Sequence, residues 1–241
     1  LRDFDELWGF VERRYAFFDE KATDWQRVRE IYRPLAAKAQ SNEAFMHVLE
    51  ATLDELYDPH CMLNANTDDS WRPVPHDVFV EERQGGVFVT GLRQYSAAEQ
   101  AGVRVGQEVV EVDGIPIDEA ARKRMPKSLA RDDPAARQWV LLSAVAGRHG
   151  YARRFQVVDR GEHRDLLVPA NGGRAGGRSE EMVRTRLLED GIGYLRIGSF
   201  ADETIVEQVD QALQELRSTR ALLIDVRSNA GGDTVVTRPV M

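Results

Sequence analysis

The feature that most restricts the fold is a strand–helix–strand pattern near the end of the chain. Residues 192–197 are typical of a strand, and residues 205–216 carry apolar side chains at the spacing of an amphipathic helix. The run from Leu222 to Val226 is short and nearly all apolar, as expected for a strand buried on both faces. Together these segments predict a βαβ unit with a right-handed crossover.

The residues that follow this unit carry the strongest chemical signal, Asp-Val-Arg-Ser-Asn-Ala-Gly-Gly at positions 225–232. They lie at the carboxyl end of a predicted parallel strand and before a predicted helix at residues 234–241, where open α/β sheets bind ligands. Gly231 and Gly232 let the backbone approach a substrate, and N–H groups at a helix N-terminus stabilise negative charge, as in an oxyanion hole. The alternative is a strand-to-helix turn that uses glycine for geometry alone. No Gly-Lys-Ser/Thr follows, which disfavours a phosphate loop.

The N-terminal part predicts helices, each with apolar side chains on one face. Thr23 and Gln26 match a capping box that opens the second helix, which extends through residues 32–33. Ser41 or Asn42 caps the third helix. That helix should end near residue 57, because the proline at position 59 disfavours helical geometry just before it.

The pattern of residue types changes between this helical part and a β-rich part. Short strand-like runs begin at Val78 and are interrupted by turn signals at Gly85-Gly86 and Asp113-Gly114. Ser96 and Glu99 match another capping box, and residues 125–147 indicate a helix. We therefore expect an N-terminal helical domain at 1–63, a β-rich domain at 76–170 and the start of an α/β core at 180–241, with linkers at 64–76 and 171–179.

Composition excludes several classes of protein. Hydrophobic residues make up 42% and charged residues 30%, which is typical of a globular chain. The net charge of −8 disfavours a nucleic-acid partner, because phosphate binding needs a basic face. No apolar run approaches the ~18 residues of a membrane span, and the first residues are not those of a signal peptide. The single cysteine, Cys61, allows no disulfide within the chain.

The run from Leu222 to Gly232 resembles the Asp-(Leu/Val)-Arg-x-Asn-x-Gly-Gly signature of the C-terminal processing and tricorn-core serine peptidases. Phe4 to Pro34 resembles the helical N-terminal region of the tricorn-like branch, and Ser96 to Ile117 resembles the bacterial PDZ pattern. The resemblance covers essentially the whole chain. It implies an α+β multidomain fold with a helical domain, a PDZ-like β-rich domain and the first part of a ClpP/crotonase-like protease core.

The resemblance implies a serine-type endopeptidase that cleaves polypeptides by acyl transfer without a cofactor, and that is able to oligomerise. In this family the nucleophile lies beyond the glycine motif, so no serine of this chain takes that role. Gly231 or Gly232 contributes the oxyanion-stabilising amide. We interpret Arg227 and Asn229, which match family positions, as shaping the loop, with Asp225 and Arg227 satisfying buried polar groups rather than contacting substrate. The alternatives are a non-catalytic relative, like the lipid-binding interphotoreceptor retinoid-binding protein with the same core, and a pure peptide-binding module. The family occurs both outside the cytoplasm and within it, so the compartment stays open.

His60 is the candidate general base, because histidine titrates near neutral pH. Tricorn-like members have Asp-Gly-His-Ser/Thr at this place and use the histidine as base, which is what the resemblance implies for His60. The sequence Asp-Pro-His-Cys at 58–61 departs from that motif. Asp-Pro-His is commoner in the processing branch, where a lysine after the serine is the base. His60 as a histidine that only stabilises its loop therefore remains the alternative.

The PDZ-like domain suggests a second site. Extended peptides add a strand to an exposed sheet edge in such domains, and backbone amides hold the terminal carboxylate. We expect Gly85 and Gly86 to form the carboxylate loop, and Val87 and Phe88 to lie on the edge strand that binds substrate C-termini. The alternative is a domain that only packs between its neighbours.

The remaining reactive side chains predict no further site. Cys61 and His60 are adjacent and should point to opposite sides, which disfavours a Cys–His pair. His47 falls among apolar neighbours on the third helix, as a packed or half-exposed histidine does. The other histidines, at positions 76, 149 and 163, lack metal-ligand spacing, so no metal is implied.

Overall fold

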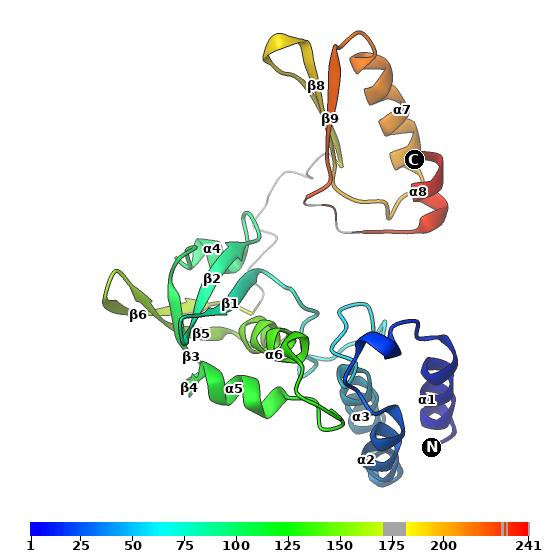
Figure 1. The fold of residues 1–241 in the computed structure, drawn as a ribbon, viewed down its shortest axis with the longest axis vertical. Coiled ribbons are helices and arrows are strands. Elements are labelled where there is room, and N and C mark those ends of the chain that lie inside the picture. Colours follow the sequence, from blue (N-terminus) through cyan, green and yellow to red (C-terminus); the bar gives the residue numbers. More distant parts are fainter. Residues whose placement is uncertain (171–181, 228, 230, 241) are drawn as a thin grey trace. The chain divides into compact units, whose positions relative to one another are not determined.

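The computed structural model describes residues 1–170, 182–227, 229 and 231–240. The chain divides into two compact units, Leu1–Ala175 and Gly176–Met241, whose elements are labelled in Figure 1. The predicted linker at 171–179 lies outside the described residues. No helix of the described part is both long and apolar enough to cross a bilayer.

The first unit begins with three helices, α1 (Arg2–Arg14), α2 (Trp25–Lys38) and α3 (Asn42–Asp54), and a short 3-10 turn, η1 (Phe18–Glu20). Ser41 caps α3, as predicted, by accepting a hydrogen bond from the Ala44 N–H. The predicted cap of α2 is wrong: Asp24 accepts from the Arg27 N–H, while the Thr23 hydroxyl donates to the Glu55 carbonyl. The helix also continues past its predicted end to residue 38.

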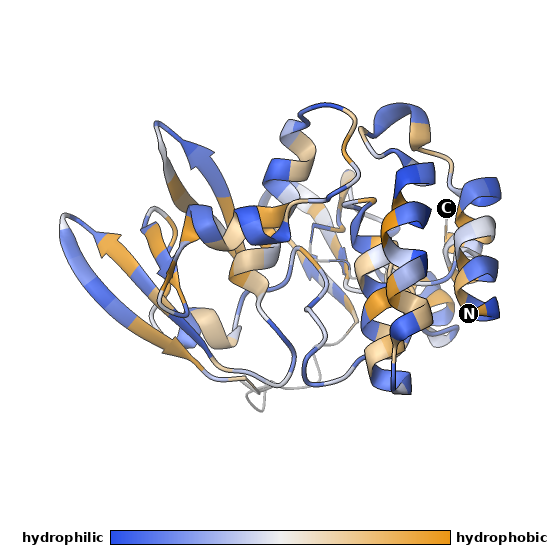
Figure 2. Cartoon of the chain, turned by 90° about the horizontal axis from the view of Figure 1, so that it is seen from below, coloured by the Kyte–Doolittle hydropathy of each residue, from blue (hydrophilic) through white to orange (hydrophobic). Residues whose placement is uncertain are grey.

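The helices enclose their own hydrophobic core, in which Phe4, Val28 and Leu56 are fully buried. The indole rings of Trp8 and Trp25 stack, and each donates its N–H to the backbone carbonyl of the other residue. Figure 2 shows hydrophilic and hydrophobic segments alternating along the helices, as expected for helices that bury one side only.

The β-rich part of the same unit is an antiparallel sheet in the order β1-β2-β3-β5-β6, with β4 paired to β3. Its strands are β1 (Val78–Arg83), β2 (Gly86–Leu92), β3 (Glu108–Val112), β4 (Ile115–Pro116), β5 (Arg153–Asp159) and β6 (Glu162–Val168). The helices of this part are α4 (Ala97–Gln100), α5 (Ile117–Arg124) and α6 (Pro134–Ala146), and α6 packs against β1.

Two expectations for this part are wrong. The helix predicted at 125–147 begins only at Pro134, because Asp133 caps it by accepting from the Ala135 N–H. The strand that carries Val87 and Phe88 is not an edge strand, because β2 lies between β1 and β3. Gly85 instead completes a two-residue hairpin turn with Gln84, and both residues have positive φ, as this tight turn requires.

A buried carboxylate joins the helical and β-rich parts. The Glu55 side chain follows α3 and is 2% exposed. It accepts hydrogen bonds from the Tyr32 hydroxyl at 2.6 Å, from the Lys127 and Ser128 N–H groups at 2.9 and 2.8 Å, and from the Ser128 hydroxyl at 2.6 Å. Beside it, the Asp24 N–H donates to the Ser128 carbonyl. The two parts therefore share one buried polar network.

The second unit contains the predicted βαβ pattern. Its sheet has the order β7 (Val183–Leu187), β8 (Ile192–Ile197) and β9 (Ala221–Asp225), in which β8 and β9 are parallel and α7 (Thr204–Leu216) connects them. A short 3-10 turn, η2 (Glu189–Gly191), precedes β8, and α8 (Thr234–Val240) follows the glycine segment.

The prediction that the last strand is buried on both faces is wrong for the described part of the chain. Leu222, Leu223 and Ile224 are 40%, 47% and 55% exposed. In that part β9 pairs with β8 alone, and α7 packs against β7 and β8 rather than over β9. The strand thus keeps an apolar surface and one free edge.

Candidate functional site

The glycine segment is tied to the end of β8 by the Asn229 side chain. Its amide donates to the Ile197 carbonyl at 3.1 Å, and its amide oxygen accepts from the Gly231 N–H at 2.7 Å. The Gly231 carbonyl in turn accepts from the Phe200 N–H at 2.7 Å and from the Ser199 hydroxyl at 3.2 Å. Asn229 and Gly231 are therefore held against the end of β8 and the residues that follow it by these hydrogen bonds.

The two glycines are not equivalent. Gly231 has a φ of 87° and open space where a Cβ would lie, so its backbone conformation is what favours glycine. At Gly232 a Cβ would lie 2.0 Å from the Phe200 carbonyl carbon, so only glycine allows this close approach. The Gly231 N–H is engaged by Asn229, whereas the Gly232 N–H donates to no other described residue. Of the two predicted oxyanion donors, Gly232 keeps its N–H available.

The motif's charged residues form a local ion pair. Arg227 donates two side-chain hydrogen bonds to Asp225, at 3.0 and 2.8 Å, and the Tyr194 hydroxyl donates a third at 2.7 Å. These bonds, from Arg227 first and Tyr194 second, hold the pKa of Asp225 far below its ordinary value. The carboxylate is buried and remains ionised, and its role is to fix the end of β9.

His60 lies in the first unit, on the loop after α3, and its side chain is 93% exposed. Its Nδ1 lies 3.3 Å from a carboxylate oxygen of Asp58, and the same oxygen accepts from the His60 N–H at 2.9 Å. The Tyr15 hydroxyl donates to the other carboxylate oxygen of Asp58 at 2.8 Å. Burial raises the pKa of Asp58, but the hydrogen bonds from His60 and Tyr15 outweigh it and leave the pKa below its ordinary value. An ionised, oriented carboxylate therefore faces Nδ1, while Nε2 remains accessible.

Cys61 does not have the character of a nucleophile. Burial, followed by the nearby Asp58 carboxylate, raises the pKa of the thiol to about 11. A thiol with this pKa is almost entirely protonated at neutral pH, and the thiolate is the reactive form.

The predicted carboxylate loop borders a cavity of about 240 Å³ that is rich in acidic groups. Gly85, Gly86 and Val87 line it together with the carboxylates of Glu82, Glu108 and Asp118. A Cβ on Gly86 would lie 2.7 Å from a Glu108 carboxylate oxygen. Arg137 pairs with Glu82 and Asp118, so the Glu108 carboxylate beside Gly86 is the lining group that most disfavours a peptide carboxylate at this position.

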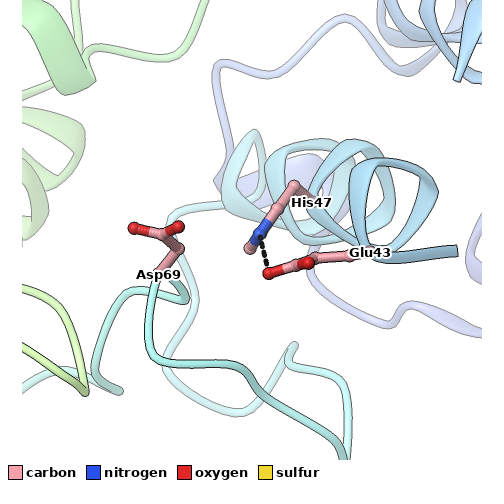
Figure 3. A group of neighbouring side chains, drawn as sticks. All are labelled: Glu43, His47 and Asp69. Atoms are coloured by element: carbon pink, nitrogen blue, oxygen red, sulfur yellow. Dashed lines mark ion pairs between the residues drawn. The ribbon is translucent and has the colours of Figure 1, made fainter. Parts of the chain in front are cut away.

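One group of neighbouring side chains was not predicted from the sequence. His47 and Glu43 lie one turn apart on α3, and Asp69 from the following loop lies beside them (Figure 3). The signal in the sequence was the four-residue spacing of Glu43 and His47, but Asp69 joins them only through the fold. His76, by contrast, is half-buried, and burial together with the positive charges of Arg153 and Arg72 lowers its pKa to about 4.

Comparison with known proteins supports the resemblance to serine peptidases at both ends of the chain. Residues 1–54 match the tricorn protease C1 domain, and residues 191–236 match peptidase family S41. The chain is 24% identical to a chloroplastic C-terminal processing peptidase of Tetradesmus obliquus, over 95% of this chain and 50% of that protein. It is 26% identical to a putative tricorn protease homolog 2 of Streptomyces coelicolor, over 87% of this chain and 18% of that protein. The chain thus spans half or less of the length of these relatives.

Solved structures show the same fold. The crystal structure of a CPAF S499A mutant matches 97% of this chain and 57% of its own, with a TM-score of 0.56 and 18% identity. Mature CPAF complexed with lactacystin matches 99% of this chain and 57% of its own, with a TM-score of 0.54 and 16% identity. The resemblance found in the sequence is confirmed: the chain is similar to C-terminal processing and tricorn-type peptidases, and its residues 191–236 match peptidase family S41.

Proposed function

We propose that this chain is the front part of a serine endopeptidase that cleaves polypeptides by acyl transfer. The observation that carries the proposal is the glycine segment after β9, where Gly232 keeps an N–H group free of other described residues. The peptidase family models that match both ends of the chain, and the similarity to a C-terminal processing peptidase, support this reaction class. The nucleophilic serine is expected in sequence that follows residue 241.

In this proposal the Gly232 N–H stabilises the oxyanion of the tetrahedral intermediate. A backbone donor serves this purpose because it is fixed in place before charge develops on the substrate oxygen. Asn229 and Phe200 hold the loop through the Gly231 N–H and carbonyl, so the conformation of Gly232 is set before substrate arrives. Gly231 then serves to shape the loop.

His60 is proposed as the general base. A base in a serine peptidase needs one ring nitrogen directed at the nucleophile and the other held by an orienting group. Asp58 holds Nδ1 of His60, Tyr15 holds Asp58, and Nε2 is left to accept a proton. The exposure of the ring gives it access to a serine supplied by another part of the protein.

The β-rich part is proposed to be a PDZ-like module that engages substrate C-termini. The acidic groups around Gly85 and Gly86 argue against a carboxylate there, and Val87 and Phe88 lie on an inner strand. The free edge of the sheet nearest α6 is β1, where the Gln138 side chain donates to the Val80 carbonyl at 2.7 Å. A peptide added to this edge would replace that side-chain contact with main-chain hydrogen bonds.

The catalytic proposal is tested on the full-length protein with His60→Ala and a peptide substrate. Loss of a general base should lower kcat by about 10²- to 10⁴-fold with the fold intact. A serine-reactive phosphonate should label the wild-type protein at a serine outside residues 1–241, and His60→Ala should slow that labelling in parallel.

His163→Ala is the matched control, since this histidine is exposed on β6 and is expected to leave kcat unchanged. Near-normal turnover in His60→Ala would mean that another group is the base, such as a lysine after the serine. Failure of the phosphonate to label any serine would end the peptidase proposal and favour a binding protein of the same fold.

A further inference from the structure

Three side chains that can bind a metal lie close together, those of Glu43, His47 and Asp69. Glu43 and His47 project from the same side of α3, and Asp69 extends from the following loop (Figure 3). Their ligand atoms all lie within 4.8 Å of one another. Two ligands of one Zn²⁺ are at most about 4.2 Å apart, twice the metal–ligand distance. Glu43 is exposed, so a small rotation of its side chain brings its carboxylate within bonding distance of an ion held by His47 and Asp69.

The histidine is oriented as a metal ligand is. Nδ1 of His47 lies 2.8 Å from a carboxylate oxygen of Glu50, which directs Nε2 toward Glu43, 3.9 Å away. A metal-binding histidine usually gives its other ring nitrogen to a carboxylate in this way, which fixes both tautomer and ring orientation. The Thr67 hydroxyl lies 3.5 Å from Nε2, at the limit of a hydrogen bond.

The loop that carries Asp69 is held in place independently of any cation. The Ser70 hydroxyl donates to the other carboxylate oxygen of Glu50 at 2.6 Å, and accepts from the Thr67 N–H at 2.8 Å. On its other side the loop pairs with residues 147–150, where the Gly150 N–H donates to the Asp68 carbonyl. One carboxylate, Glu50, thus orients His47 and also anchors the segment that supplies Asp69.

The charge around this position favours a cation. Glu43, Glu50 and Asp69 are acidic, and the positive charge closest to them in the described contacts is Arg148, 3.1 Å from Asp69 and 45% exposed. The Tyr151 hydroxyl also bonds to Asp69, and this hydrogen bond is the main cause of the raised pKa of Tyr151. A divalent ion would replace an exposed, weak ion pair with coordination by three side chains.

We propose that Glu43, His47 and Asp69 bind a divalent transition-metal cation, with Zn²⁺ the best probe. One imidazole and two carboxylates suit Zn²⁺ and its neighbours in the first transition row better than Ca²⁺ or Mg²⁺, which prefer all-oxygen sites. The bound ion would connect α3 to the loop that contacts residues 147–150. Its role is to stiffen the junction between the helical and β-rich parts, and it takes no part in peptide hydrolysis.

The test is titration calorimetry of the 241-residue chain, freed of metal, with Zn²⁺ at pH 7.5. We expect one site per chain, at least tenfold weaker binding in His47→Gln and in Glu43→Gln, and no change in the matched control His163→Gln. Mg²⁺ should bind far more weakly than Zn²⁺. Zn²⁺ should also raise the Tm of the wild-type chain and not that of His47→Gln, because binding to the folded state alone stabilises it.

X-ray absorption of the zinc complex gives a readout that does not depend on the variants, with one imidazole and oxygen ligands expected. Zinc binding of equal strength in His47→Gln and wild type, a spectrum without imidazole, or no saturable binding would each overturn the proposal. Circular dichroism of the metal-free variants confirms that Glu43→Gln and His47→Gln fold before their affinities are compared.

Discussion

At the scale of single residues, Glu55 shows how a carboxyl side chain is buried among hydrogen-bond donors. Both of its carboxylate oxygens are occupied by N–H and O–H donors from Tyr32, Lys127 and Ser128. A buried acceptor whose hydrogen bonds are all made avoids the cost of an unsatisfied polar group in the interior. No local pattern predicts this role, since two of the three donor residues, Lys127 and Ser128, lie more than 70 positions away.

Replacement of this carboxylate tests the network. In Glu55→Gln an NH₂ group replaces one carboxylate oxygen. Because NH₂ cannot accept a hydrogen bond, one or more of the buried donors that bonded to that oxygen lose their partner. We expect the free energy of unfolding to fall by about 2–3 kcal/mol. Urea denaturation followed by circular dichroism measures it, with the exposed Glu30→Gln on α2 as the control. Equal stability of both variants would mean that Glu55 does not hold the two parts together.

Predicting elements from sequence succeeded where one local signal determines them. Ser41 and Ser96 cap their helices as their sequence context indicated, because each bond is made within a few residues. The cap of α2 was missed because Thr23 has a stronger tertiary partner, the Glu55 carbonyl. The inner position of β2 and the difference between Gly231 and Gly232 depend on neighbours distant in sequence, so no local pattern could have predicted them.

The exposed surface of β9 has a measurable effect in the 241-residue chain. Three consecutive apolar side chains on a strand with a free edge form a template for pairing with another chain. We expect concentration-dependent self-association by sedimentation velocity, and we expect Ile224→Lys to reduce it severalfold. Leu167→Lys is the matched control, because Leu167 is equally exposed but β6 already carries charged side chains. Self-association that persists unchanged in Ile224→Lys would assign it to another surface.

At the scale of the whole molecule, chemistry and recognition are distributed along the chain. The candidate base follows the third helix, the β-rich part supplies the candidate peptide edge, and the candidate oxyanion donor lies in the second unit. The βαβ unit and the peptidase resemblance were predictable from the sequence, because the glycine motif and the apolar strand are local. The edge position of β1 was not, since it depends on the order of strands in the sheet.

Peptide binding to the 241-residue chain tests the recognition function. A peptide with a free, apolar C-terminus should bind at least tenfold more tightly than its amidated form, measured by fluorescence anisotropy. Val80→Pro on β1 should weaken that binding, because proline removes a main-chain donor from the edge. Val105→Pro, at an exposed loop position of the same part, is the control for a general effect of proline. Equal affinity for free and amidated peptides would favour a β-rich part that serves only to pack between its neighbours.

The network around Glu55 also affects how the protein is made. Ser128 lies 73 positions after Glu55, so the helices leave the ribosome before the amides that their buried carboxylate needs have been synthesised. Until then the only donor to that carboxylate from among its described partners is the Tyr32 hydroxyl, which lies in the helical part itself. The helical part therefore completes its hydrogen bonding only after residues 127 and 128 have been made.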